Sequence, residues 1–181
     1  MRARSNICTK LHIFGHRMEA ILPLYYWPPI GWLQAAMGLR VFGVGYPERL
    51  PRSSFYYRCY VPAHGWLSVP LCRDSRKTPW HATWPPDSRW KTYHFKVLQT
   101  LYGKAPFFLE WKPLLEEIYF DPAYQTLGEV AWRIIQEIAL WHGWKVSLSK
   151  EGIPMPLSFP AEAKVSSIDL LLRVGLSSES L

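Results

Sequence analysis

The pattern of the chain changes near residue 89, and this change limits the folds that the chain can adopt. Before residue 89, short apolar and aromatic segments are separated by Pro and Gly; after it, apolar residues recur at helical spacing. The first part predicts strands at 20–24, 40–44, 55–61 and 66–71, and a helix at 30–37. The second part predicts helices at 89–103, 106–120 and 126–143, a strand at 144–148, and a closing helical turn at 168–172.

Strands that precede helices are typical of α+β proteins rather than of alternating βαβ units. We expect a small, mainly antiparallel sheet with a β-hairpin formed by 55–61 and 66–71, followed by and packed against about three helices. Residues 73–88 contain three prolines and predict a long ordered loop. Thr126 and Glu129 have the spacing of a capping box, which predicts the start of the last long helix.

Length and composition predict one folded domain at 18–181, preceded by an extension at 1–17 that we expect to be disordered. The chain has 181 residues, of which 49% are hydrophobic and 19% charged. Met18 offers an alternative start to Met1. No apolar run approaches the roughly 20 residues that span a bilayer. The three cysteines are far apart and form no C-x-x-C pair, so we expect a reducing, cytoplasmic compartment.

Charge is distributed unevenly along the chain. Residues 1–104 contain 15 Lys/Arg and 4 Asp/Glu, a net charge of +11, whereas residues 105–181 contain 6 and 10, a net charge of −4. A basic half rich in Trp and Tyr suits an anionic small molecule such as an activated sugar, or nucleic acid with bases stacked on the rings. A solvated basic surface without a ligand is the alternative. Because the sequence contains no recognisable nucleic-acid-binding motif, we rank nucleic acid below an anionic small molecule as the partner.

Several ordered motifs resemble those of the WbqC-like family of bacterial surface-polysaccharide gene clusters. The resemblance covers roughly residues 20–149, together with a closing segment in a shortened C-terminal region. The motifs are the aromatic-proline-glycine opening at 22–32, F-Y-Y-R-C-Y at 55–60, W-L-S-V-P at 66–70, W-x-x-x-H at 90–94, Y-G-K-A-P-F-F at 102–108, and S-S-I-D-L-L-L at 166–172.

The resemblance implies a role in O-antigen or related polysaccharide biosynthesis, with transfer of a group onto, or modification of, an activated sugar. It implies no cofactor and no defined mechanism. Two departures from the family pattern, Leu24-Tyr25-Tyr26 in the opening and Tyr56-Tyr57 before Arg58, together with the short C-terminal region, keep open a non-catalytic structural or partner protein. The basic, aromatic half keeps open a nucleic-acid-binding module. The sequence predicts no metal site and no particular oligomeric state.

His94 is the candidate catalytic acid or base, because imidazole titrates near neutrality and the resemblance places a histidine at this point. A hydrogen-bonded core histidine is the alternative, because His94 lies within an apolar stripe.

Four further residues are candidates for substrate binding. The planar guanidinium of Arg58 suits a carboxylate or phosphate, and Lys104 follows a helix end where its ammonium can meet an anion. Tyr25 and Trp90 can provide aromatic walls for a sugar or base. The alternatives are a surface arginine, a lysine that complements the helix dipole, and aromatic rings that belong to the core.

Overall fold

The computed structural model describes residues 21–39, 41–52, 54–75, 77–149 and 165–174. Its strands are β1 (Ile21–Pro23), β2 (Val41–Gly45), β3 (Arg58–Val61), β4 (Gly65–Ser68) and β5 (Lys145–Leu148). Its helices are α1 (Ile30–Leu39), α2 (Trp90–Tyr102), α3 (Phe108–Phe120), α4 (Leu127–Trp141) and α5 (Ser167–Val174), with short 3-10 helices η1 (Arg73–Ser75) and η2 (Pro79–His81). The mixture of helices and small sheets confirms the α+β class.

The larger sheet has three parallel strands in the order β1-β2-β5. Helix α1 joins β1 to β2, so these three elements form a βαβ unit, and α4 precedes β5, which pairs on the other side of β2. The expectation of a mainly antiparallel sheet without βαβ units is therefore wrong for this sheet. The physical reason is that β2 takes the central position between strands that are distant in sequence, and both connections contain helices.

The second sheet is the predicted hairpin. Strands β3 and β4 are antiparallel, with Arg58 opposite Ser68 and Tyr60 opposite Trp66. Gly65 has φ of +96°, a conformation that glycine adopts without the strain of a side chain, and it allows the turn to close. The alternation along β3 and β4 buries Cys59 and Leu67 and leaves the opposite face turned outward.

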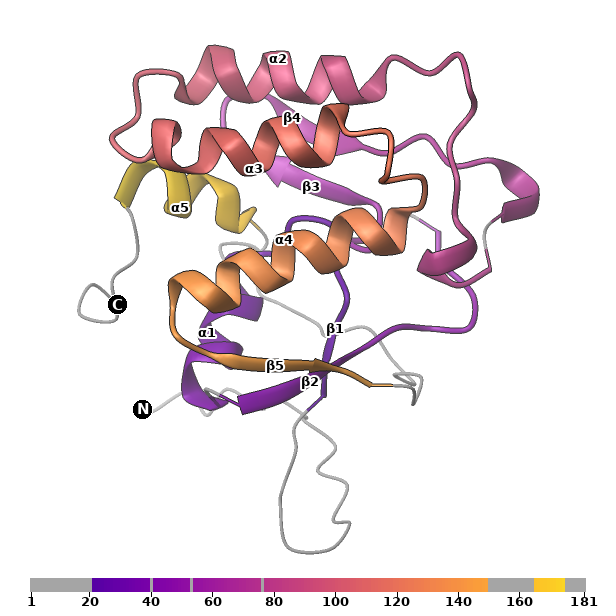
Figure 1. Ribbon diagram of the computed structural model, residues 1–181, viewed down its shortest axis with the longest axis horizontal. Helices are drawn as coiled ribbons and strands as arrows, with labels where there is room; N and C mark the ends of the chain where they lie inside the picture. The colour runs from indigo at the N-terminus through magenta and orange to yellow at the C-terminus, as the bar shows by residue number, and fades with distance from the viewer. Residues whose placement is uncertain (1–20, 40, 53, 76, 150–164, 175–181) are drawn as a thin grey trace, which may run out of the picture.

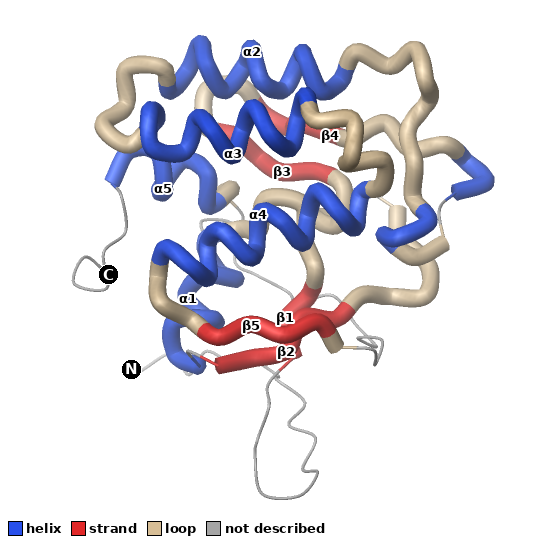
Figure 2. Tube along the Cα trace, viewed as in Figure 1, coloured by secondary structure: helices blue, strands red, loops and turns tan. Residues whose placement is uncertain are grey.

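The helices connect the two sheets. Figure 1 shows α2 and α3 side by side in front of the β3–β4 hairpin, with α4 between α3 and the parallel sheet, and contacts join α3 to α4 and α4 to β5. Figure 2 shows α4 between the β3–β4 hairpin and the parallel sheet in this view. Helix α5 contacts α1, α2 and α3 and so joins the C-terminal segment to the core. None of the described helices is long and apolar enough to cross a membrane.

The capping box predicted at the start of α4 is confirmed. The Thr126 hydroxyl accepts from the Glu129 backbone N–H at 3.3 Å, and the Glu129 carboxylate accepts from the Thr126 N–H at 2.8 Å. Helix α3 contains Pro113 within its span without ending there. The predicted extension at 1–17 lies outside the described residues.

Candidate functional site

Four buried side chains form a continuous chain of hydrogen bonds beneath the hairpin. The Trp27 indole N–H donates to the Tyr119 hydroxyl at 3.1 Å, and that hydroxyl lies 2.8 Å from the Tyr26 hydroxyl. The Tyr26 hydroxyl in turn lies 2.8 Å from His94 Nδ1. Each of these residues is at most 1% exposed, so α2, α3 and the aromatic opening segment meet in a polar cluster inside the core.

Which group donates in each of these hydrogen bonds follows from Trp27 and His94, the two ends of the hydrogen-bonded series. The Trp27 indole nitrogen only donates, and the His94 ring also bonds the backbone of Ser68, where the carbonyl oxygen is the acceptor. His94 Nε2 therefore carries the proton, and Nδ1 accepts from Tyr26. Tyr26 then accepts from Tyr119, which accepts from Trp27. Every polar atom in the chain has a partner, as buried polar groups require.

Burial sets the protonation state of His94. The imidazole is 1% exposed, and burial is the main reason that its pKa falls to about 3, although the Ser68 backbone hydrogen bond acts in the opposite direction. Burial also raises the pKa of Tyr26 and of Tyr119. The cluster is consequently neutral near pH 7. This geometry fits a histidine that fixes β4 to α2, and its role as an acid or base stays a prediction.

Tyr25 and Trp90 also lie inside the core. Tyr25 is 1% exposed and packs against Tyr56, with ring centroids 4.9 Å apart. Trp90 is 5% exposed and packs against His94 and Trp84, with ring centroids 5.1 Å apart in both pairs. The rings of both residues pack against other side chains of the core rather than against the exposed hairpin. Direct ligand contact by either ring stays a prediction.

Arg58 belongs to an aromatic surface on the outer face of the hairpin. We call this surface, formed by Arg58, Tyr60, Trp66 and Ser68, the hairpin face. The Arg58 Cζ lies 4.1 Å from the centre of the Trp66 ring, which is 42% exposed, and the Tyr60 ring lies 5.5 Å from it. No carboxylate among the described residues forms an ion pair with Arg58. The guanidinium thus lies over an indole ring, and it has no carboxylate partner among the described residues.

The polar cluster and the hairpin face share strand β4. His94 bonds the backbone of Ser68, and Ser68 is the residue paired with Arg58 across the hairpin. At the hairpin turn, the Tyr93 hydroxyl lies 3.1 Å from His64 Nε2, which makes a second connection between α2 and the hairpin. The buried cluster therefore positions β4, the strand that carries the exposed Trp66 ring.

Lys104 is not brought to this site. It is exposed and follows the end of α2, ten residues beyond His94, a separation of roughly 15 Å along a helix axis. Sequence reasoning also missed Tyr60 and Trp66. The two-residue period of the strands was the available signal, because it places both side chains on the same face as Arg58.

Among the described residues, no group of three or more His, Cys, Asp or Glu side chains is arranged to hold a metal ion. Cys59 is buried on the inner face of the hairpin, and burial raises the pKa of its thiol to about 12. That thiol is a poor nucleophile near pH 7, because the thiolate is the reactive form.

The class of protein is thus an α+β domain with a parallel three-stranded sheet, a helical layer and a separate hairpin that carries an arginine-aromatic surface. The model of the WbqC-like protein family matches residues 24–151, well over half of the chain. The chain belongs to the WbqC-like protein family. No curated protein and no solved structure matches it.

Proposed function

We propose that the protein binds a nucleoside-diphosphate sugar on the hairpin face and acts on it, as a cytoplasmic transferase, in the biosynthesis of a bacterial surface polysaccharide. The observation that carries this proposal is the Arg58 guanidinium, which has no ion-pair partner among the described residues and lies 4.1 Å from the centre of the exposed Trp66 ring. Family membership and the basic N-terminal half support it.

Each group on the hairpin face has a role in the proposal. The remaining guanidinium N–H groups of Arg58 donate to the diphosphate, for which the planar fork is suited. The exposed rings of Trp66 and Tyr60 offer flat apolar surfaces on which a sugar or base stacks. His94 holds β4 in place from within the core, as a positioning residue, and Tyr25 and Trp90 pack behind the site. Lys104, exposed beyond the end of α2, has no part in this site.

The same face suits single-stranded nucleic acid, because stacked bases and phosphates need the same residue types. Salt dependence separates the two ligands. A ligand with two phosphates releases few counterions, whereas a single strand that contacts six or more phosphates loses about 300-fold or more in affinity between 50 and 200 mM salt.

Calorimetric titration of the purified protein with a panel of nucleoside-diphosphate sugars and with a single-stranded oligonucleotide tests the proposal. We expect at least one nucleotide sugar to bind and to lose less than about tenfold in affinity between 50 and 200 mM salt. Steeply salt-dependent binding of the oligonucleotide, with no nucleotide sugar bound, would support the nucleic-acid module. Binding of neither ligand would favour a non-catalytic partner protein.

A further inference from the structure

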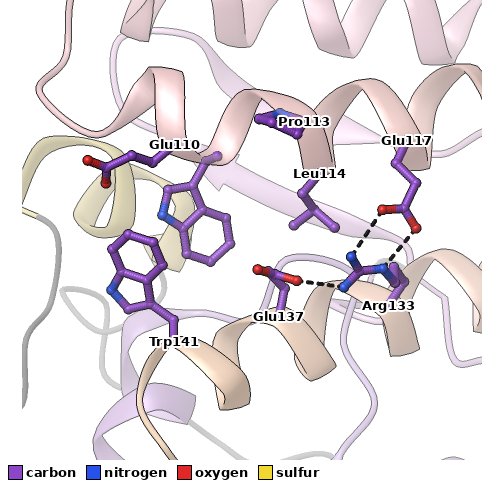
Figure 3. A pocket seen from close by; sticks show the side chains of 8 residues that line it. Glu110, Pro113, Leu114, Glu117, Arg133, Glu137 and Trp141 are labelled. Carbon is purple, nitrogen blue, oxygen red and sulfur yellow. Dashed lines mark hydrogen bonds and ion pairs between the residues drawn. The ribbon is translucent and has the colours of Figure 1, made fainter.

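A hollow of about 120 Å³ between α3 and α4 is lined only by residues of these two helices. Figure 3 shows its arginine, Arg133, between Glu117 and Glu137, which accept from Nε at 2.8 Å and from Nη1 at 2.7 Å. Both carboxylates compensate the guanidinium charge. The diphosphate of the proposed ligand therefore has an arginine without an ion-pair partner at Arg58, on the hairpin face, but not in this hollow.

Helix α2 lies along the free edge of β4. The Val69 N–H donates to the Tyr57 carbonyl at 2.8 Å, so this residue directs its backbone groups towards the β3 side of the hairpin. Backbone direction alternates along an antiparallel strand, and the Ser68 carbonyl therefore points away from β3. His94 donates to that carbonyl. Tyr93, the residue before His94, is consequently placed beside the hairpin rather than beneath it.

A histidine and a tyrosine form an exposed pair at the tip of the hairpin. The Tyr93 hydroxyl lies 3.1 Å from His64 Nε2, and the two ring centroids are 5.8 Å apart. Tyr93 is 52% exposed, and His64 is exposed as well. Ala63, directly before His64, has φ of +63°, an uncommon conformation for a residue with a side chain. Backbone strain of this kind is concentrated at functional sites in proteins.

The pair offers one donor and one acceptor to a ligand, whichever group donates in its internal hydrogen bond. If the Tyr93 hydroxyl donates to Nε2 of the neutral imidazole, then His64 Nδ1 carries the proton and the Tyr93 oxygen can accept. If Nε2 donates, Nδ1 can accept and the Tyr93 O–H can donate. A sugar hydroxyl also donates and accepts, whereas each group on the edge of a nucleobase is fixed as a donor or an acceptor. The pair therefore suits two neighbouring sugar hydroxyls better than a base.

Three kinds of side chain follow one another along the hairpin towards this pair. Arg58 lies opposite Ser68, Trp66 lies two residues nearer the turn on β4, and His64 lies two residues further. Residues in a strand are about 3.3 Å apart, so roughly 10 Å separates Arg58 from Val61, where the turn begins. The order of cation, exposed indole and hydrogen-bonding pair matches the order of diphosphate, sugar ring and distal sugar hydroxyls.

We infer that the sugar of the nucleoside-diphosphate sugar stacks on Trp66 and that two of its neighbouring hydroxyls bind His64 and Tyr93 at the hairpin tip. This inference rests on the proposed function and gives the ligand a direction, with the diphosphate at Arg58 and the sugar towards the turn. His64 and Tyr93 are then residues that determine which sugar is bound. A site built to hydrogen-bond a hydroxyl discriminates against sugars that lack it.

Calorimetric titration of the whole chain tests the inference, with UDP-glucose, UDP-galactose, GDP-mannose, dTDP-glucose, UDP, GDP and dTDP as probes. Each variant is titrated with the nucleotide sugar that binds the parent protein most tightly and with the corresponding nucleoside diphosphate. We expect Tyr93→Phe and His64→Ala each to raise the Kd of the nucleotide sugar about three- to tenfold, because each removes a hydrogen bond to the sugar. The Kd of the nucleoside diphosphate should change less than about twofold, because it has no sugar at the tip.

His81→Ala is the matched control. His81 is also exposed and its Nδ1 lies 2.8 Å from the Thr78 hydroxyl, but it belongs to η2, outside the hairpin, so both Kd values should stay unchanged. Equal weakening of the nucleotide sugar and the nucleoside diphosphate in the tip variants would overturn the inference, because a base or a purely structural contact would then lie at the tip. Unchanged Kd values in both tip variants would overturn it while leaving the proposed function intact. If no probe binds the parent protein, the proposed function fails and the inference fails with it.

Discussion

The protein is expected to lose about 1.4 kcal/mol of unfolding free energy between pH 7.5 and pH 5.5 because of His94 alone. In the folded chain, burial lowers the pKa of His94 to about 3, whereas an unfolded histidine has a pKa of about 6.5. As the pH falls below about 6.5, the unfolded chain binds a proton that the folded chain does not, so stability is lost with acid. Over the whole window down to the folded pKa, the loss is on the order of 4 kcal/mol.

Urea denaturation at pH 7.5 and pH 5.5 measures this loss of unfolding free energy. Both pH values lie above the pKa of most carboxylates, so carboxylate titration contributes little to the difference. His94→Gln removes the titrating group, while its amide can still donate to Ser68 and accept from Tyr26. This variant should show a much smaller pH dependence than the parent protein. His142→Gln is the matched control, because burial lowers the pKa of His142 as well, but the residue is only partly buried and lies outside the polar cluster. An unchanged pH dependence in His94→Gln would contradict the buried, neutral histidine.

Gly128→Ala is expected to destabilise the protein by about 1–3 kcal/mol, although alanine is normally the better helix former. A Cβ atom at Gly128 would lie 2.7 Å from two ring carbons of Trp80 and 3.0 Å from its backbone nitrogen. The backbone of this 3-10 segment is fixed to α4, since the Leu127 N–H donates to the Ala82 carbonyl at 2.8 Å. Rotation of the Trp80 side chain alone therefore does not relieve the contact.

Gly38→Ala in α1 is the matched control, because no atom lies within 4 Å of the Cβ that it would add. Alanine should stabilise that position by up to about 1 kcal/mol, so the two substitutions have opposite signs. Thermal or urea unfolding of the two variants gives the comparison. If Gly128→Ala also stabilised the protein, the close packing of η2 on α4 would be incorrect.

Local patterns were sufficient to predict the hairpin, the long helices and the capping box. The hairpin strands are neighbours in sequence, and the Thr126–Glu129 contact spans a single helical turn. The parallel sheet was missed because its pairs join Ile21 to Gly43 and Val41 to Lys145, and nothing in strands of three to five residues specifies such distant partners. The elements of the βαβ unit were all predicted, but their arrangement depends on tertiary packing.

The candidate site was predicted in part. The helical stripe that contains His94 left both a catalytic and a core role open, and the partner that favours the core role, Tyr26, lies 68 residues away. The outward direction of Arg58 follows from strand alternation, but the contact with Trp66 depends on the register of the hairpin. The hollow between α3 and α4 was not predicted, because it depends on how two separate helices pack.

The comparison of Arg58→Gln with Arg73→Gln tests the proposed nucleotide-sugar site most directly. Both arginines lie in the basic half, but Arg73 is exposed in η1 and lies outside the hairpin face. Charged hydrogen bonds contribute about 1.5–3 kcal/mol, so we expect Arg58→Gln to raise the Kd of the best nucleoside-diphosphate sugar by about 10- to 100-fold. Arg73→Gln should change that Kd by less than about twofold. Equal Kd values for the two variants would contradict a diphosphate site at Arg58.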